Sequence, residues 1–339
     1  VLASWINEYD ANLKTLMEQT KNDLSVAVED INTKLDQLSE LNSSIAHEIF
    51  SNNDYDGVNY GPNDLLDQRN VILDDLSRYG DVQVTDLEDG KIQVKINGKV
   101  VVDASGASYT NDKLNIGSDG VTLTWNSNNQ NANLGAGAIR GFTDMLTGAD
   151  PINAGIPYYQ NKMDNFAQTL ADVFNKKIHA DDPDFPDKYK FLLQGGVDGK
   201  VTAGNISISD QWADDVSYII RKQNPDGELD NQDILDMKAA FEQDFNFGGE
   251  YTGTFSEFIT SVTNTLGSGI KTNSARMSAS LAIAESADSE RMGVSGVSLN
   301  EEGISMMTYN KAYQALGRLM TTMDEQLDMI INKMGIVGR

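Results

Sequence analysis

Apolar residues recur every seven positions near both ends of this chain, and that spacing constrains the fold more than any other feature. In the first fifty residues, a second apolar series falls four residues after the first. The two series together are Met17, Leu24, Val28, Ile31, Leu35, Leu38, Asn42, Ile45 and Ile49. Such spacing is typical of a long helix that buries one continuous seam. Asn42 is the polar member of this seam, where a buried amide could fix the register.

The end of the chain repeats the pattern without a polar break. Its seam comprises Met306, Tyr309, Tyr313, Leu316, Met320, Met323, Leu327, Ile330 and Met334. Ser298 to Glu301 fit a capping box, so we predict that a helix begins there. A third periodic stretch runs from Phe255 to Ala284, and we expect it to lie antiparallel to the last helix across Gly293 to Gly296.

The middle of the chain has the spacing of strands. Asp89-Gly90 and Asn97-Gly98 flank an alternating run from Lys91 to Ile96, and this arrangement predicts tight β-hairpins. We expect a small β unit from Val82 to about Ile139, with an exposed loop at 126–133. Helical spacing returns from Pro157 to Ile178.

These patterns predict an α+β fold, mainly α: an elongated helical bundle built from both chain ends, with a small β domain inserted. The expected parts are the N-terminal part of the bundle at 1–80, the inserted β domain at 81–139, and the C-terminal part of the bundle at 140–339. Glycines make residues 200–208 harder to place, and we expect one short extra strand there.

Charge and composition exclude several classes of function. The chain has 51 acidic and 26 basic residues, for a net charge of −25, which disfavours nucleic-acid and membrane-surface partners. It contains no stretch of the roughly 18 apolar residues that a membrane span needs, and its first residues do not resemble a signal peptide. The absence of cysteine excludes disulfides and thiolate chemistry, and suits a protein assembled outside the cell.

The search for catalytic residues gives structural interpretations instead. His47 and His179 are the two histidines, and each is expected near the C-terminal end of a helix, where a partly charged imidazole complements the dipole. Gly135, Gly137 and Gly141 approach a dinucleotide loop, but the spacing is one residue too long and no buried strand precedes them, so a flexible junction is favoured. We therefore predict no enzyme activity, no catalytic residues and no cofactor.

Two acidic clusters could in principle gather calcium. They comprise Asp181, Asp182, Asp184 and Asp187 in one, and Asp226, Glu228, Asp230 and Asp233 in the other. Neither follows the spacing of a calcium-binding loop, so solvated acidic loops are favoured and no metal site is predicted.

The methionines of the last helix allow two compatible interpretations. Met306, Met320, Met323 and Met334 share one stripe, and unbranched thioethers are good fillers of irregular cores. A methionine-rich seam can also repack against neighbours of different geometry, as a polymer subunit at a mechanical junction must.

Three segments carry a resemblance to a known family. The FlgK family, the first hook-filament junction protein of the bacterial flagellum, is similar to this chain at residues 63–77 and at 139–142 with 171–175. The terminal signature of junction proteins resembles residues 296–302 with Tyr309, 312–315 and 324–327. The last of these segments is shared with hook and rod proteins. The resemblance runs from about residue 20 to 335.

The resemblance implies a structural subunit between hook and filament that acts as adaptor for filament assembly. It implies an extracellular protein, secreted by the flagellar type III apparatus without a cleaved signal peptide, and needed for motility. Its implied partners are the hook protein, the second junction protein, further copies in a ring, and an export chaperone. The family's N-terminal export and polymerisation segment is not found before Val1, so a fragment is expected.

Three alternatives stay open at this stage. One is another flagellar axial protein, such as a hook, rod or flagellin-like subunit. Another is a calcium-binding surface adhesin that uses the acidic clusters. The last is an enzyme, namely a carboxylate-based glycosidase, which would need a deep cleft with two carboxyl groups.

Overall fold

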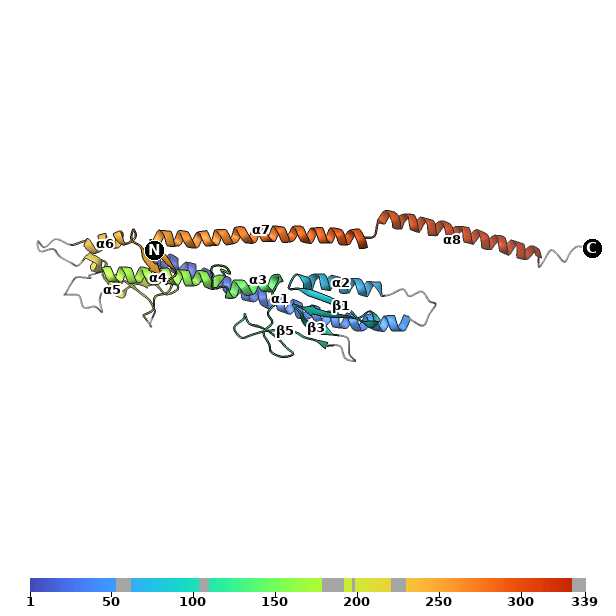
Figure 1. The fold of residues 1–339 in the computed structure, drawn as a ribbon, viewed down its shortest axis with the longest axis horizontal. Coiled ribbons are helices and arrows are strands. Elements are labelled where there is room, and N and C mark those ends of the chain that lie inside the picture. The colour runs from blue at the N-terminus through green and yellow to red at the C-terminus, as the bar shows by residue number, and fades with distance from the viewer. Residues whose placement is uncertain (53–61, 104–109, 179–191, 197–198, 221–229, 331–339) are drawn as a thin grey trace, which may run out of the picture. The chain divides into compact units, whose positions relative to one another are not determined.

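The structure is a computed structural model that describes residues 1–52, 62–103, 110–178, 192–196, 199–220 and 230–330. The chain divides into two compact units, Val1–Gly269 and Ile270–Arg339. Figure 1 shows the elements of both.

The first unit is built along α1 (Leu2–Asn52), a single helix of 51 residues. The predicted seam is buried from Leu24 to Ile45 and half-buried at Ile49. Leu24, Leu35, Leu38 and Ile45 are fully inaccessible, and Val28 and Ile31 nearly so. Asn42 is also fully buried. The heptad prediction for this helix is therefore confirmed.

A helix and a small sheet cover the C-terminal half of α1 (Figure 1). The helix is α2 (Asn63–Ser77), which is the segment that resembles the junction-protein family. The sheet is antiparallel and contains β1 (Val82–Asp86), β2 (Ile92–Ile96), β3 (Lys99–Asp103) and β4 (Thr110–Asn111) in that order, with the 3-10 turn η1 (Glu88–Gly90) between the first two strands. A second antiparallel pair follows, β5 (Leu114–Ile116) with β6 (Leu123–Trp125).

The hairpin between β2 and β3 turns where the sequence predicts it. Asn97 and Gly98 have φ values of 50° and 80°, and these left-handed conformations suit a two-residue turn that matches the twist of the strands. Alternate β2 residues Ile92, Val94 and Ile96 face the core with the α1 seam. The core therefore lies between one face of α1 and one face of the sheet.

Helix asparagines fasten strands to the helices by their side-chain amides. Asn42 donates to the Ile92 carbonyl at 2.8 Å and accepts from the Ile92 amide at 3.1 Å. Asn32 binds Leu114 in the same way, with both distances at 2.9 Å. Asn175, on another helix, binds both backbone groups of Leu193 and also the Leu192 amide. Each amide satisfies strand groups that would otherwise be costly to bury.

The other half of the first unit has an aromatic core. Its residues come from α4 (Ile156–Lys177), β7 (Leu193–Gln194), α6 (Gln232–Ala240), β9 (Phe245–Phe247) and β10 (Tyr251–Gly253). Tyr218 of η3 (Val216–Ile220) and Trp212 of α5 (Asp210–Asp214) belong to a small separate cluster, and β8 (Ser207–Ile208) pairs with β7. The buried residues of α3 (Gly137–Thr147) belong instead to the core around the α1 seam. Phe247 stacks on Phe258 with ring centroids 4.3 Å apart, and Phe166 lies against both rings. Ile6 of α1 contributes to the same core.

The long helix α7 (Phe255–Ser295) starts in this core and continues into the second unit, which also contains α8 (Leu299–Asp328). The predicted antiparallel packing of these helices is not found among the described residues. Apolar side chains on both helices stay exposed, among them Ile270, Met277, Leu281 and Leu316. Three residues, Gly296 to Ser298, separate the helices, and a loop of this length allows both a hairpin and a continued rod.

The predicted fold class is confirmed, since long helices dominate and the sheets are small and antiparallel. The extra strand expected at 200–208 is limited to Ser207 and Ile208, because turns occupy the glycine-containing residues before it. No described helix is long and apolar enough to cross a membrane. The three-part division at residues 80 and 139 stays a prediction.

Candidate assembly surface

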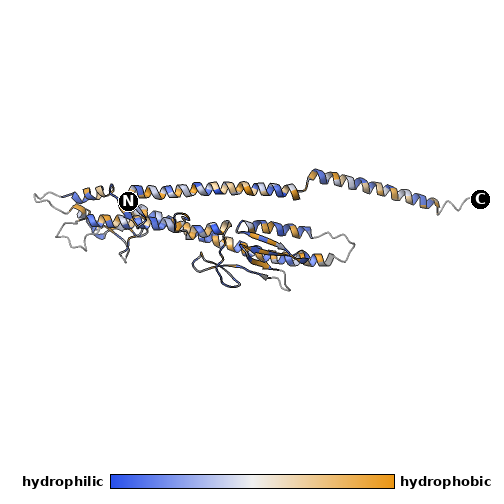
Figure 2. Ribbon diagram, viewed as in Figure 1, coloured by the Kyte–Doolittle hydropathy of each residue, from blue (hydrophilic) through white to orange (hydrophobic). Residues whose placement is uncertain are grey.

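The α8 helix carries the clearest unpartnered surface of the second unit. Its predicted a and d residues lie on one stripe, and each of them is between 51 and 78% exposed. They are Met306, Tyr309, Tyr313, Leu316, Met320, Met323, Leu327 and Ile330. Figure 2 shows that hydrophobic and hydrophilic residues are interleaved along this helix. Exposed apolar stripes of this size mark sites of protein association. We call this set the α8 stripe.

The local sequence explains why α8 is a helix without a core to support it. The Ser298 hydroxyl accepts a hydrogen bond from the Glu301 amide at 3.4 Å, which confirms the predicted cap. Glu301 and Glu302 place negative charge in the first turn, where the helix dipole favours it. Gly303 and Gly317 lie inside the helix with open space around them, and each lowers helix stability by about 1 kcal/mol relative to alanine. Packing along the stripe is the stabilisation that this helix lacks alone.

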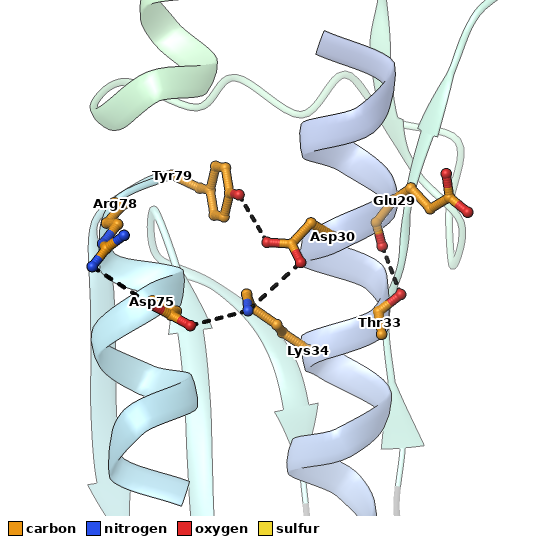
Figure 3. Close-up of polar contacts among 7 residues, drawn as sticks. All are labelled: Glu29, Asp30, Thr33, Lys34, Asp75, Arg78 and Tyr79. Atoms are coloured by element: carbon orange, nitrogen blue, oxygen red, sulfur yellow. Dashed lines mark hydrogen bonds and ion pairs between the residues drawn. The ribbon is translucent and has the colours of Figure 1, made fainter. Parts of the chain in front are cut away.

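A polar clamp holds the end of α2 against α1 (Figure 3). The Lys34 ammonium lies 3.1 Å from the Asp75 carboxylate and 3.6 Å from the Asp30 carboxylate. The Tyr79 hydroxyl donates to Asp30 at 2.8 Å, and Arg78 approaches Asp75 at 3.8 Å. The hydrogen bond to Asp30, helped by burial, raises the pKa of the Tyr79 phenol. The clamp fixes the point at which the chain leaves α2 for the sheet.

Buried Arg69 makes a second link from α2. Its guanidinium donates to the Gly90 carbonyl at 2.6 Å, so it holds the turn before β2. Burial lowers the pKa of Arg69, and nearby Asp86 opposes that shift. Clamp and arginine together make the segment 63–77 a rigid support for the sheet.

Ser127, Lys99 and Asp112 form a polar cluster that sequence analysis did not identify. The Asp112 carboxylate accepts from the Ser127 hydroxyl at 2.5 Å and pairs with the Lys99 ammonium at 3.2 Å. Burial opposes ionisation of Asp112, but the bonds from Ser127 and Lys99 outweigh it and lower the pKa of that carboxyl. A lysine must be neutral to act as a base toward serine, whereas this one is ion-paired. The cluster therefore fastens the loop after β6 to the β3–β4 sheet.

A cavity of about 510 Å³ lies between α4, the β9–β10 hairpin and the start of α7. Lys162 lines it, and its ammonium pairs with Glu250 at 2.5 Å and lies 5.2 Å from the Tyr158 ring centroid. Lys162 is the cation of this cavity that an anionic ligand would contact, and the pairing with Glu250 already compensates its charge. The arrangement shows an internal tie between α4 and the hairpin.

The histidines and glycines that the sequence pattern singled out have structural places where they are described. His47 is exposed near the end of α1, and His179 lies outside the described residues. Gly137, at φ +76°, begins α3 so close to the Tyr79 and Gly80 backbone that a Cβ would lie 2.3 Å from it. Its glycine serves close packing, and Gly135 and Gly141 are exposed.

Most of the acidic residues considered for calcium lie outside the described residues, namely Asp181, Asp182, Asp184, Asp187, Asp226 and Glu228. Of the remainder, Asp230 accepts from the Gln232 amide at 2.8 Å at the start of α6, and Asp233 is buried. Among the residues that the structure describes, no group of three potential ligands is placed to hold a metal ion.

Comparisons with known proteins match two regions of the chain separately, one that begins with α1 and one that contains α8. Residues 1–185, which contain α1 to α4, match the flagellar hook-associated protein FlgK helical domain. Residues 289–333, which contain α8, match the flagellar basal body rod FlgEFG protein C-terminal family. The chain is also 26% identical over 379 aligned positions to flagellar hook-associated protein 1 of Bacillus subtilis (strain 168), covering all of this chain and 70% of that protein.

Both matches define the chain as a structural protein of the flagellar axis that associates with other axial proteins. The exposed α8 stripe and the packing of α1 against its sheet agree with this class. Because the first match extends over more than half of the 339 residues, the chain belongs to the flagellar hook-associated protein FlgK family. This confirms the family predicted from the three sequence segments.

Proposed function

We propose that this protein is a structural subunit of the junction between flagellar hook and filament, and the adaptor on which the filament assembles. The observation that carries the proposal is the exposed α8 stripe, which lies in the segment matched to rod proteins, on a chain whose first half belongs to the FlgK family. Its work is packing and load transfer, for which no catalytic residue is needed.

The proposed contacts divide between the two units. The α8 stripe packs on another helix, because eight apolar side chains in a heptad series match a helical partner. In the first unit, the α1 seam is already buried by other elements of the same unit. Neighbouring subunits therefore contact the outer surface of this unit and not the seam. The proposed partners are the hook protein, the second junction protein and further copies in a ring, with an export chaperone before assembly.

The proposed location is outside the cell, after secretion through the flagellar type III apparatus without a cleaved signal peptide. Family membership supports this route. The absence of cysteine suits it as well, since no thiol can cross-link the chain in an oxidising medium.

The test is a strain that lacks the gene, complemented with the full-length protein or with a variant. We expect the deletion strain to make hooks without filaments and to lose flagellin to the medium, and the wild-type gene to restore filaments. Leu316→Asp should fail to restore them, because a charge in the middle of the stripe opposes helix packing. Leu235→Asp on α6, where the leucine is 49% exposed outside the stripe, is the matched control and should restore them. Normal filaments in the deletion strain would contradict the proposal.

A second candidate is another axial role, such as that of a hook or rod subunit. The match of residues 289–333 to rod proteins is the observation that favours it. Immunogold labelling of isolated hook-basal bodies with filaments separates the two: a single band at the distal end of the hook supports the junction, while label along the rod or hook supports the alternative.

A further inference from the structure

The sulfur atoms of this chain are distributed unevenly. It has 12 methionines and no cysteine, so the thioether is the sole sulfur chemistry available. Met163 and Met237 in the first unit are 9 and 8% exposed. The methionines of α8 and its last described turn are between 54 and 71% exposed, namely Met306, Met307, Met320, Met323 and Met329.

These methionines fall on two faces of one helix. Met306 and Met320 occupy the a series of the α8 stripe, and Met323 occupies the d series. At 100° per residue, Met307 and Met329 lie on the opposite face. Exposure is comparable on both faces, so a small oxidant reaches both sets of methionines equally well. Oxidation changes the packing surface on the stripe face alone.

We propose that Met306, Met320 and Met323 are oxidation sites that make the α8 stripe redox-sensitive before assembly. A lone pair of the thioether sulfur attacks one oxygen of hydrogen peroxide, the O–O bond breaks, and the other oxygen leaves as hydroxide. The oxygen now on sulfur passes its proton to the hydroxide, which gives the sulfoxide S=O bond and one water. Sulfur is oxidised by two electrons and the peroxide is reduced. The product is a polar sulfoxide where an apolar side chain stood.

The effect on assembly rests on the function proposed above. A sulfoxide oxygen in the stripe has no hydrogen-bond partner once an apolar helix covers it, so oxidised α8 packs poorly. The same packing excludes peroxide, so an assembled subunit is protected. Sulfoxide at Met307 or Met329 leaves the stripe unchanged.

The first measurement concerns the free protein. The purified full chain is exposed to hydrogen peroxide, quenched at intervals, digested and analysed by mass spectrometry. Oxidation at Met306, Met320 and Met323 should be on the order of tenfold faster than at Met163 and Met237. Equal rates at the two sets would overturn the proposal.

The second measurement concerns assembly. The deletion strain is complemented with two triple variants at Met306, Met320 and Met323, one to Leu and one to Gln, which approximates the polarity of the sulfoxide. A double variant Met307→Gln and Met329→Gln is the control. The Leu variant and the control should restore filaments, and the stripe Gln variant should reduce filaments per cell by about tenfold. Circular dichroism of each purified variant checks that its helix content is unchanged.

The outcomes separate this inference from the proposed function. If filaments need the chain but the stripe Gln variant restores them fully, the inference is wrong and the junction role stands. If the deletion strain makes normal filaments, the junction role itself fails. Stripe methionines in isolated hook-filament complexes should oxidise more slowly than in the free chain, and equal rates would contradict the protection that packing provides.

Discussion

The helices α1 and α8 have the same heptad spacing and reach opposite states in the structure. From Leu24 to Ile45, the α1 seam is inaccessible beneath α2 and the strands. The eight residues of the α8 stripe are at least half exposed. A heptad pattern therefore shows that a helix has an apolar face, and does not show what covers it. In this chain, one copy of the pattern fills the core of a unit and the other stays exposed.

Matched substitutions in the two seams should give the largest contrast. Leu35→Asp places an unpaired carboxylate in a filled core and should lower the free energy of unfolding of the first unit by about 4 kcal/mol. Leu316→Asp, at the same heptad position of α8, should change the free energy of unfolding of the second unit by less than about 0.5 kcal/mol, since water already reaches that side chain. Urea unfolding followed by circular dichroism measures both, and similar losses would remove the contrast.

The Asn42 amide tests whether the covered seam depends on polar fastening. Asn42→Ala leaves the Ile92 amide and carbonyl without their partner and should destabilise the first unit by about 2 kcal/mol. Hydrogen exchange at the Ile92 amide should accelerate in step. Asn128→Ala, in an exposed loop, is the control and should have almost no effect. Unchanged exchange at Ile92 would mean that water replaces the amide.

A smaller effect is expected from the clamp between α1 and α2. Tyr79→Phe removes the bond to Asp30 and should cost about 1 kcal/mol at neutral pH. Because the pKa of Tyr79 is raised in the folded state, its contribution is present below the unfolded value of 10.0 and is lost as pH rises through the folded value. Wild type and Tyr79→Phe should thus converge in stability at strongly alkaline pH, and a constant difference would contradict this.

The smallest effect is local, in the turn between β5 and β6. Hydrogen bonds from the Thr122 hydroxyl, the Thr122 amide and the Val121 amide lower the pKa of Asp119 to about 2. Its stabilising contribution is present above the unfolded value of 3.8 and is lost as pH falls through about 2. Carboxyl titration by NMR should find this low pKa in wild type. In Thr122→Val, it should move toward 3.8, since the hydroxyl bond is gone.

The sequence predicts elements better than the contacts between them. The α1 heptads, the cap at Ser298 and the Asn97-Gly98 turn are each specified by a few neighbouring residues, and all are present. The partner of the α1 seam depends on distant strands, so periodicity alone could not identify it. The expectation that α7 and α8 pack against each other was wrong, because periodicity shows that a helix has an apolar face and not what covers that face.

The candidate surface was predicted in part. The methionine-rich stripe could be read from spacing, but its exposure could not, because an apolar stripe looks the same covered or bare. The fastening asparagines were harder to find. Asn42 was noticed because it interrupts a heptad, whereas Asn32 and Asn175 fall where polar residues are ordinary on a helix. Both asparagines lie close to a predicted apolar face, and that position could have identified them. Many other polar residues share that position, so it is not sufficient by itself.

Those asparagines have a mechanical consequence. Asn32 and Asn42 hold two different strands to one helix, each by an amide that grips both the N–H and the C=O of a single residue. A force along α1 is therefore divided between these two pairs of hydrogen bonds. The helix can shift by one residue against the strands only if both pairs break. A flagellar part that turns under torque gains from such a joint, because force along the helix passes into two separate sheets at once.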